Sequence, residues 1–206
     1  MTKWKPEKTK PQQPRSVRVP APTRFIESFG SAPRDIGPIT PGMSLALLTR
    51  GQFSQIDALV HILDQVGPAD VTLWSATIAE ENEATAFHTP KLFLDLIKNE
   101  RIKSCVLVSE PGVLRESSDL VAAFQARFGD GSVRYAPMHA KIITVRTPAL
   151  NIVARGSVTL NASNHIENLD ICDSAELCDY IRRIELSLHL LPRLESQVSF
   201  ETGWSV

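Results

Sequence analysis

The repeated succession of a strand-length apolar run and an amphipathic helix most constrains the fold of this chain. The run "MSLALLTR" at 43–50 has strand length, and in "QIDALVHILDQV" at 55–66 the apolar residues recur at helical spacing. Two further strand and helix pairs follow: "VTLWSA" (71–76) with "TPKLFLDLIKN" (89–99), and "SCVLVSE" (104–110) with "SSDLVAAFQARF" (117–128). This alternation predicts an α/β domain with helices on both sides of a mixed, largely parallel sheet.

The first 41 residues differ from the rest in composition. They contain eight prolines, too many to sustain a helix or an interior strand. We therefore expect a basic, extended and flexible arm at 1–41 and a folded domain at 42–206. Up to residue 24 the arm carries seven Lys or Arg and a single acidic residue, Glu7. Such a segment suits either binding along nucleic-acid phosphates or a solvated tail.

Composition excludes several classes of protein. Of 206 residues, 43% are hydrophobic, enough for one sizeable core, and the net charge of −1 alone predicts no polyanion partner. The three cysteines lack the spacing of a metal site, so we expect reduced thiols in the cytoplasm. No apolar run of about 18 residues and no apolar leader occurs, which predicts neither membrane spanning nor secretion. We expect no metal and no cofactor, since no acidic or histidine cluster has ligand spacing.

The chemistry concentrates in "MHAKIITVRTPALNIVARGSVTLNASNHIENLD" at 138–170. Two strand-like stretches, 132–146 and 151–157, flank "TPAL", which suits a hairpin turn. On a strand, His139 and Lys141 point the same way. An imidazole can attack phosphorus, and an adjacent ammonium stabilises charge on phosphate oxygens. The second strand returns beside the first and ends at Gly156-Ser157, which predicts a phosphate site at two neighbouring strand ends.

Further residues complete this predicted site. Asn168 and Asp170 bring an amide and a carboxylate that we expect to orient the ring of His139 and set its tautomer. Beyond them, "SAELCDYIRRIELSLHLL" at 174–191 has one apolar face and predicts a final helix.

This ordered set resembles the signature of the phospholipase D superfamily: His-x-Lys, an aspartate five residues later, Gly-Ser-x-Asn and a downstream acidic residue. His139, Lys141 and Gly156-Ser157 match it, and Asn168 and Asp170 sit where the small bacterial nucleases of the superfamily carry an asparagine and a glutamate. The resemblance covers about three quarters of the chain and implies a phospholipase D-like α/β/α sandwich.

Two positions depart from this signature. Arg146 stands where the superfamily has its aspartate, and Thr159 stands at the asparagine of Gly-Ser-x-Asn. A hydroxyl donates one proton where an amide donates two, so Asn161 is a further candidate for that position.

The resemblance also implies a mechanism. The superfamily site uses two copies of the motif, and this chain has one, which implies a homodimer with a shared site. One His139 would become the phosphohistidine and its symmetry mate would act as general acid. Lys141 and Ser157 would hold the phosphoryl oxygens, and Asp170 would orient the histidine. The expected substrate contacts are Gly156, Thr159, Asn161 and Asn168.

Single-motif members of the superfamily are mostly nucleases, so the resemblance implies a metal-independent phosphodiesterase acting on DNA, with RNA as the other polymer. Two alternatives stay open. One is a degenerate member of the superfamily that binds nucleic acid without cutting it, which the residues Arg146 and Thr159 favour. The other is a phosphodiesterase acting on lipid, which liposome binding would reveal.

Overall fold

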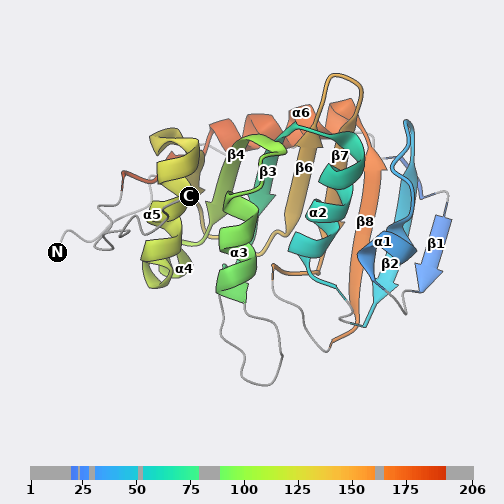
Figure 1. Ribbon diagram of the computed structural model, residues 1–206, viewed down its shortest axis with the longest axis horizontal. Coiled ribbons are helices and arrows are strands. Elements are labelled where there is room, and N and C mark those ends of the chain that lie inside the picture. Colours follow the sequence, from blue (N-terminus) through green and yellow to red (C-terminus); the bar gives the residue numbers. More distant parts are fainter. Residues whose placement is uncertain are drawn as a thin grey trace, which may run out of the picture.

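A mixed β-sheet forms the middle layer of the protein in a computed structural model (Figure 1). The structure describes residues 20–22, 24–27, 31–50, 53–78, 89–160 and 165–193. Within these ranges the sheet has nine strands in the order β1-β2-β8-β7-β6-β3-β4-β5-β9. None of the helices described there is long and apolar enough to cross a membrane.

The strands are β1 (Arg24–Glu27), β2 (Ser44–Thr49), β3 (Ala69–Trp74), β4 (Ile102–Ser109), β5 (Val133–Tyr135), β6 (Ile142–Arg146), β7 (Asn151–Gly156), β8 (Glu167–Asp173) and β9 (His189–Leu190). The helices are α1 (Ala32–Ile36), α2 (Gln55–Val66), α3 (Thr89–Ile97), α4 (Pro111–Glu116), α5 (Ser118–Phe128) and α6 (Ala175–Leu186), with a 3-10 turn η1 (Asp130–Ser132). The strand and helix alternation from residue 43 to residue 128 is as predicted.

The sheet is largely antiparallel, so the prediction of a largely parallel sheet is wrong. Parallel pairing is confined to β1 with β2, β3 with β4, and β4 with β5. The reason lies in the second half of the chain, where β6, β7 and β8 follow one another without intervening helices and therefore pair antiparallel. The turn between β6 and β7 is the predicted hairpin, closed by the Thr147 N–H donating to the Leu150 carbonyl at 2.9 Å.

Helices cover both faces of the sheet, as predicted, but unequally. Figure 1 shows α2, α3 and α5 on the near face, where the main core is buried, and α6 behind the sheet. The strands contribute alternate residues to this core, among them Leu47, Leu73, Leu107, Ile143 and Ile171. On the other face, α6 packs a smaller cluster that includes Trp74, Val108, Val153, Cys172, Leu177 and Ile181. The architecture is therefore a three-layer α/β/α arrangement with one well-covered face and one face covered by α6.

Two helix starts follow from capping residues. Ser54 begins α2 with a reciprocal cap, in which its hydroxyl accepts from the Asp57 N–H and its own N–H donates to the Asp57 carboxylate. Ser174 caps α6 by accepting from the Leu177 N–H at 3.3 Å. Helix α6 ends at Leu186, earlier than predicted, because the chain then leaves the sheet face to pair as β9 with β5.

The folded part begins earlier than predicted. Strand β1 pairs in parallel with β2, and α1 buries Ala32 and Ile36 in the main core. Both elements lie inside the segment expected to be an extended arm. Pro33 does not prevent α1, because it occupies the first turn, where a missing N–H breaks no helical hydrogen bond. Residues 1–19 of the expected arm lie outside the described residues.

Candidate active site

Most of the predicted site residues gather at one edge of the sheet. Strands β2, β3, β4 and β7 end there, and the antiparallel strands β6 and β8 begin there. We call this the carboxyl edge. The segment that carries His139 and Lys141 enters β6 at this edge, Gly156-Ser157 leaves β7, and Asn168 lies near the start of β8. Residues far apart in sequence thus meet on three adjacent strands.

His139 and Lys141 precede β6 rather than lying on it, so their predicted place on a strand is wrong by a few residues. Their segment is held mainly by backbone contacts. The Met138 N–H donates to the Glu110 carboxylate at 3.3 Å, and the Lys141 carbonyl accepts from the Gly156 N–H at 3.2 Å. The Lys141 ammonium donates to the His139 carbonyl at 3.0 Å. The His139 side chain is exposed, so its imidazole is open to a large substrate.

Gly156 has a structural reason to be glycine. A Cβ at this position would lie 2.0 Å from the Asn168 carbonyl oxygen, closer than any side chain can approach. The absence of a side chain lets β8 run directly against the end of β7. The backbone of β8 is therefore the group that approaches Gly156.

Ser157 fastens the same two strands. Its N–H donates to the Asn168 carbonyl at 2.9 Å, and its hydroxyl oxygen accepts from the Asn168 N–H at 3.0 Å. A serine hydroxyl that accepts one bond keeps its own proton as a donor. Ser157 is thus fixed in position and can still donate to an anionic oxygen at the carboxyl edge.

The loop after Ser157 is anchored to the start of α2. The Thr159 carbonyl accepts from the Gln55 N–H at 2.8 Å, and Val158 and Leu160 are buried on either side. This contact and the Ser54 cap occupy N–H groups in the first turn of α2. These groups are therefore not available to bind a phosphate. The remaining candidate of this loop, Asn161, lies outside the described residues.

Asp170 does not meet the histidine within one chain. On β8 it lies between Arg155 of β7 and Ala46 of β2, and it alternates with Leu169 and Ile171 of the main core, which places it on the α6 side. Lys141 has the opposite placement, because the next residue, Ile142, packs on the α6 side. Among the described residues, no hydrogen bond or ion pair joins Asp170 to His139 or Lys141.

Sequence reasoning missed the polar groups that fix the ends of β3 and β4. The buried Ser109 hydroxyl donates to the Ser75 carbonyl at 2.7 Å, and the Ser75 hydroxyl donates to the Thr77 carbonyl at 2.6 Å. Glu110, which positions Met138, directly follows Ser109. The available signal was their place immediately after two apolar strand runs, where side chains reach the carboxyl edge.

The geometry suits chemistry on a phosphodiester of a large molecule. An exposed imidazole, an ammonium group and a fixed hydroxyl donor occupy one open edge, where a polymer can approach. In the described ranges, no group of three or more His, Cys, Asp or Glu side chains is arranged to hold a metal ion.

No model of a known protein family matches this chain, and neither does any of the curated proteins with which it was compared. The resemblance to the phospholipase D superfamily therefore rests on the motif residues themselves and on their places at the carboxyl edge.

Proposed function

We propose that this protein is a metal-independent phosphodiesterase that cleaves nucleic acid, with DNA as the preferred substrate, at the carboxyl edge. One observation carries the proposal. His139, Lys141 and Gly156-Ser157, the residues that match the superfamily signature, meet at one edge because the β6–β7 hairpin pairs Lys141 with Gly156. We infer that these residues bind one phosphate group together.

In the proposed mechanism an imidazole nitrogen of His139 attacks the phosphorus and displaces the ester oxygen. That oxygen takes a proton from His139 of a second protomer. Water then attacks the phosphohistidine and gives its proton to the second histidine as the P–N bond breaks. Lys141 and the Ser157 hydroxyl stabilise the charge on the phosphoryl oxygens. Asp170 has no part in this scheme, because it lies on the α6 side of the sheet.

The proposed homodimer would provide the second histidine. The chain carries one copy of the motif, and a twofold interface across the carboxyl edge would supply the other. Two large apolar side chains support an interface here: Ile166 is 70% exposed and Leu48 is 52% exposed. They lie at the same corner of the sheet, since Leu48 is in register with Asn168. Exposed apolar groups beside polar ones are typical of protein contact surfaces.

The test is cleavage of plasmid and single-stranded DNA in excess EDTA by the wild type, His139→Ala and His189→Ala. His189 is an exposed histidine on β9, four strands from β6, and serves as the matched control. We expect wild type and His189→Ala to cut, and His139→Ala to lose about a thousandfold or more in rate, as for removal of a nucleophile. Equal cleavage by His139→Ala would overturn the proposal.

A second candidate is nucleic-acid binding without cleavage. The separation of Asp170 from His139 favours it, because the expected partner of the histidine ring is absent within one chain. This candidate predicts that wild type and His139→Ala both shift DNA in a gel and that neither cuts it. Running the same assay on RNA, and measuring binding to liposomes, would separate the polymer and lipid alternatives.

A further inference from the structure

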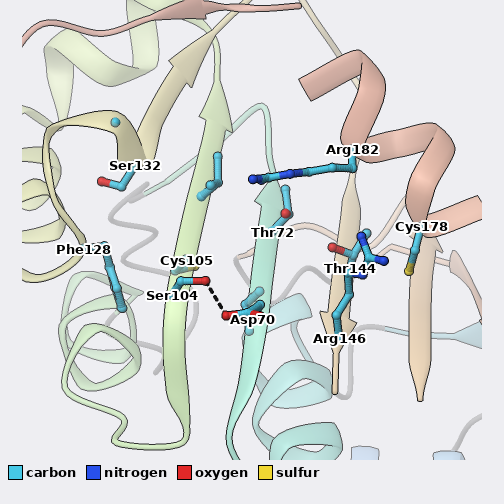
Figure 2. A pocket seen from close by; sticks show the side chains of 13 residues that line it. Asp70, Thr72, Ser104, Cys105, Phe128, Ser132, Thr144, Arg146, Cys178 and Arg182 are labelled. Atoms are coloured by element: carbon cyan, nitrogen blue, oxygen red, sulfur yellow. Dashed lines mark hydrogen bonds between the residues drawn. The ribbon is translucent and has the colours of Figure 1, made fainter. Parts of the chain in front are cut away.

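A polar hollow lies on the α6 side of the sheet, toward the end opposite to the carboxyl edge. It has a volume of about 370 Å³. Figure 2 shows it between α6 and the amino-terminal halves of β3 and β4. Its main polar lining residues are Asp70, Thr72, Ser104, Thr144, Arg146 and Arg182. None of them belongs to the proposed phosphodiesterase site.

The floor of the polar hollow is made of hydroxyl groups where the rest of the sheet face is apolar. Thr72 and Thr144 are buried and are direct neighbours across β3 and β6. Thr72 donates to the Glu185 carboxyl group at 2.9 Å, whereas the Thr144 hydroxyl forms no hydrogen bond among the described residues. The buried hydroxyl of Ser132, which also lines the hollow, has no partner in the described chain. An unpaired buried hydroxyl such as that of Ser132 is costly, and a polar ligand would satisfy it.

Two arginines from different elements line the hollow. Arg146, at the end of β6, is held by Asp179 at 2.8 Å and its side chain is 37% exposed. Arg182, on α6, binds the buried Glu185, and its side chain is 47% exposed. A guanidinium has five N–H donors, so one carboxylate leaves several of them for another acceptor. Cations fixed in this way are suited to an oxyanion.

An acceptor, Asp70, lies beside Arg146 as its cross-strand neighbour. Asp70 of β3 accepts from the Ser104 hydroxyl of β4 at 2.6 Å, and both side chains line the hollow (Figure 2). A carboxylate bound by one hydroxyl keeps further lone pairs for a second hydroxyl donor. The hollow thus combines two guanidinium groups with hydroxyl and carboxylate groups.

We propose that the polar hollow binds a small hydroxylated oxyanion, either a phosphate monoester or a carboxylate of sugar size. Arg146 and Arg182 bind the oxyanion, and Asp70, Thr144 and Ser132 bind the hydroxyl groups. The volume of 370 Å³ lies near the lower end of the range for small-molecule pockets, which fits a sugar-sized ligand. This inference is independent of the proposed cleavage at the carboxyl edge.

The test is titration of the full chain with ribose 5-phosphate, gluconate and ribose, followed by ¹H–¹⁵N NMR. We expect one or both of the anions to shift the amide signals of Thr72, Thr144 and Arg146, and uncharged ribose to leave them unchanged. Which anion binds distinguishes the phosphate from the carboxylate. Arg146→Met should weaken binding by about tenfold or more, since it removes a charge-assisted contact.

The matched control is Arg183→Met, the same substitution on α6 at a residue that lies against Tyr180 and outside the hollow. It should bind as the wild type does. Thr144→Val, which removes a hydroxyl that has no partner, should also weaken binding while the protein stays folded. The inference is overturned if neither anion binds, if the shifts are confined to the carboxyl edge, or if Arg146→Met and Arg183→Met bind equally.

Discussion

The carboxyl edge and the polar hollow lie toward opposite ends of the same sheet and hold their polar groups differently. At the carboxyl edge the backbone is fixed: Glu110 binds the Met138 N–H, and Ser157 and Asn168 exchange two hydrogen bonds. The imidazole of His139 is exposed. In the polar hollow the side chains bind one another, as in Thr72 with Glu185, Ser104 with Asp70 and Arg146 with Asp179.

The stability of the protein should therefore respond differently to substitutions in the two regions. At the carboxyl edge, the His139 and Lys141 side chains can change while the backbone contacts of their segment stay in place, whereas Gly156 leaves no room for an added Cβ. In the polar hollow, removing the Thr72 hydroxyl leaves the buried Glu185 carboxyl group without one of its donors, so stability depends on a side chain there. The following substitutions test this contrast, beginning with the largest expected effect.

Gly156→Ala should destabilise the protein by about 3 kcal/mol or more, because overpacking here forces backbone apart. The new Cβ would lie 2.0 Å from the Asn168 carbonyl oxygen. Gly112→Ala is the matched control, since a Cβ there meets nothing within 4 Å. It lies in α4 and should gain up to about 1 kcal/mol from the higher helix propensity of alanine. Urea unfolding followed by circular dichroism measures the free energy of unfolding of both variants. Equal values would show that the backbone at Gly156 does not exclude a Cβ.

Thr72→Val should cost about 1 to 3 kcal/mol of unfolding free energy, because the buried Glu185 carboxyl group loses its hydroxyl donor. Thr144→Val replaces the neighbouring hydroxyl, which has no hydrogen bond in the described chain, and should change stability by less than about 0.5 kcal/mol. The two substitutions are identical in chemistry and adjacent in space. If they proved equally harmless, side-chain pairing would not be what stabilises the polar hollow.

Alkaline pH should lower the free energy of unfolding through Cys178 of α6, which lines the polar hollow. Burial raises the pKa of this thiol from 9.0 to about 12. The unfolded chain therefore loses the proton first, so the stabilisation is complete below pH 9.0 and is lost as the pH rises toward 12. Above pH 9.0 the wild type should lose up to about 1.4 kcal/mol per pH unit more than Cys178→Ala. Parallel slopes of unfolding free energy against pH for the two proteins would contradict this.

Lys141→Met and His139→Ala should have the smallest effect on stability, within about 0.5 kcal/mol of the wild type. The contacts that hold their segment run through the Met138 N–H and the Lys141 carbonyl, which both variants keep. Thermal unfolding of the two variants beside Thr72→Val measures the contrast directly. A loss as large as that of Thr72→Val would show that the carboxyl edge also depends on its side chains.

Local sequence signals predicted the strands and helices better than they predicted which strands pair. The first three strand and helix pairs and the "TPAL" turn were visible because periodicity and turn residues are local properties. Strand β8 was not assigned, although Leu169 and Ile171 alternate with the polar residues Asn168 and Asp170. Its insertion between β2 and β7 made the sheet antiparallel there. That position depends on which strand edges are open in the assembled sheet, and no short stretch of sequence records it.

The carboxyl edge and the polar hollow also differ in how far the sequence predicted them. The motif residues of the carboxyl edge were predictable because a compact stretch of 33 residues contains them, whereas Ser75, Ser109 and Glu110 lie outside that stretch. The residues of the polar hollow were not predictable, because they come from separate strands and from α6. Only the register that aligns Thr72 with Thr144 brings them together.

The place of β8 also sets an order of assembly during synthesis. Among the described strands, β2 pairs with β1 and β8, and β8 contains residues 167–173. A nascent chain that has not yet reached residue 167 therefore cannot join β2 to the growing sheet through main-chain pairing. Such late, long-range pairing slows folding and leaves the edges of β2 and β7 open in the meantime. Strand β2, which leaves the ribosome early, is therefore among the last strands to be paired into the sheet.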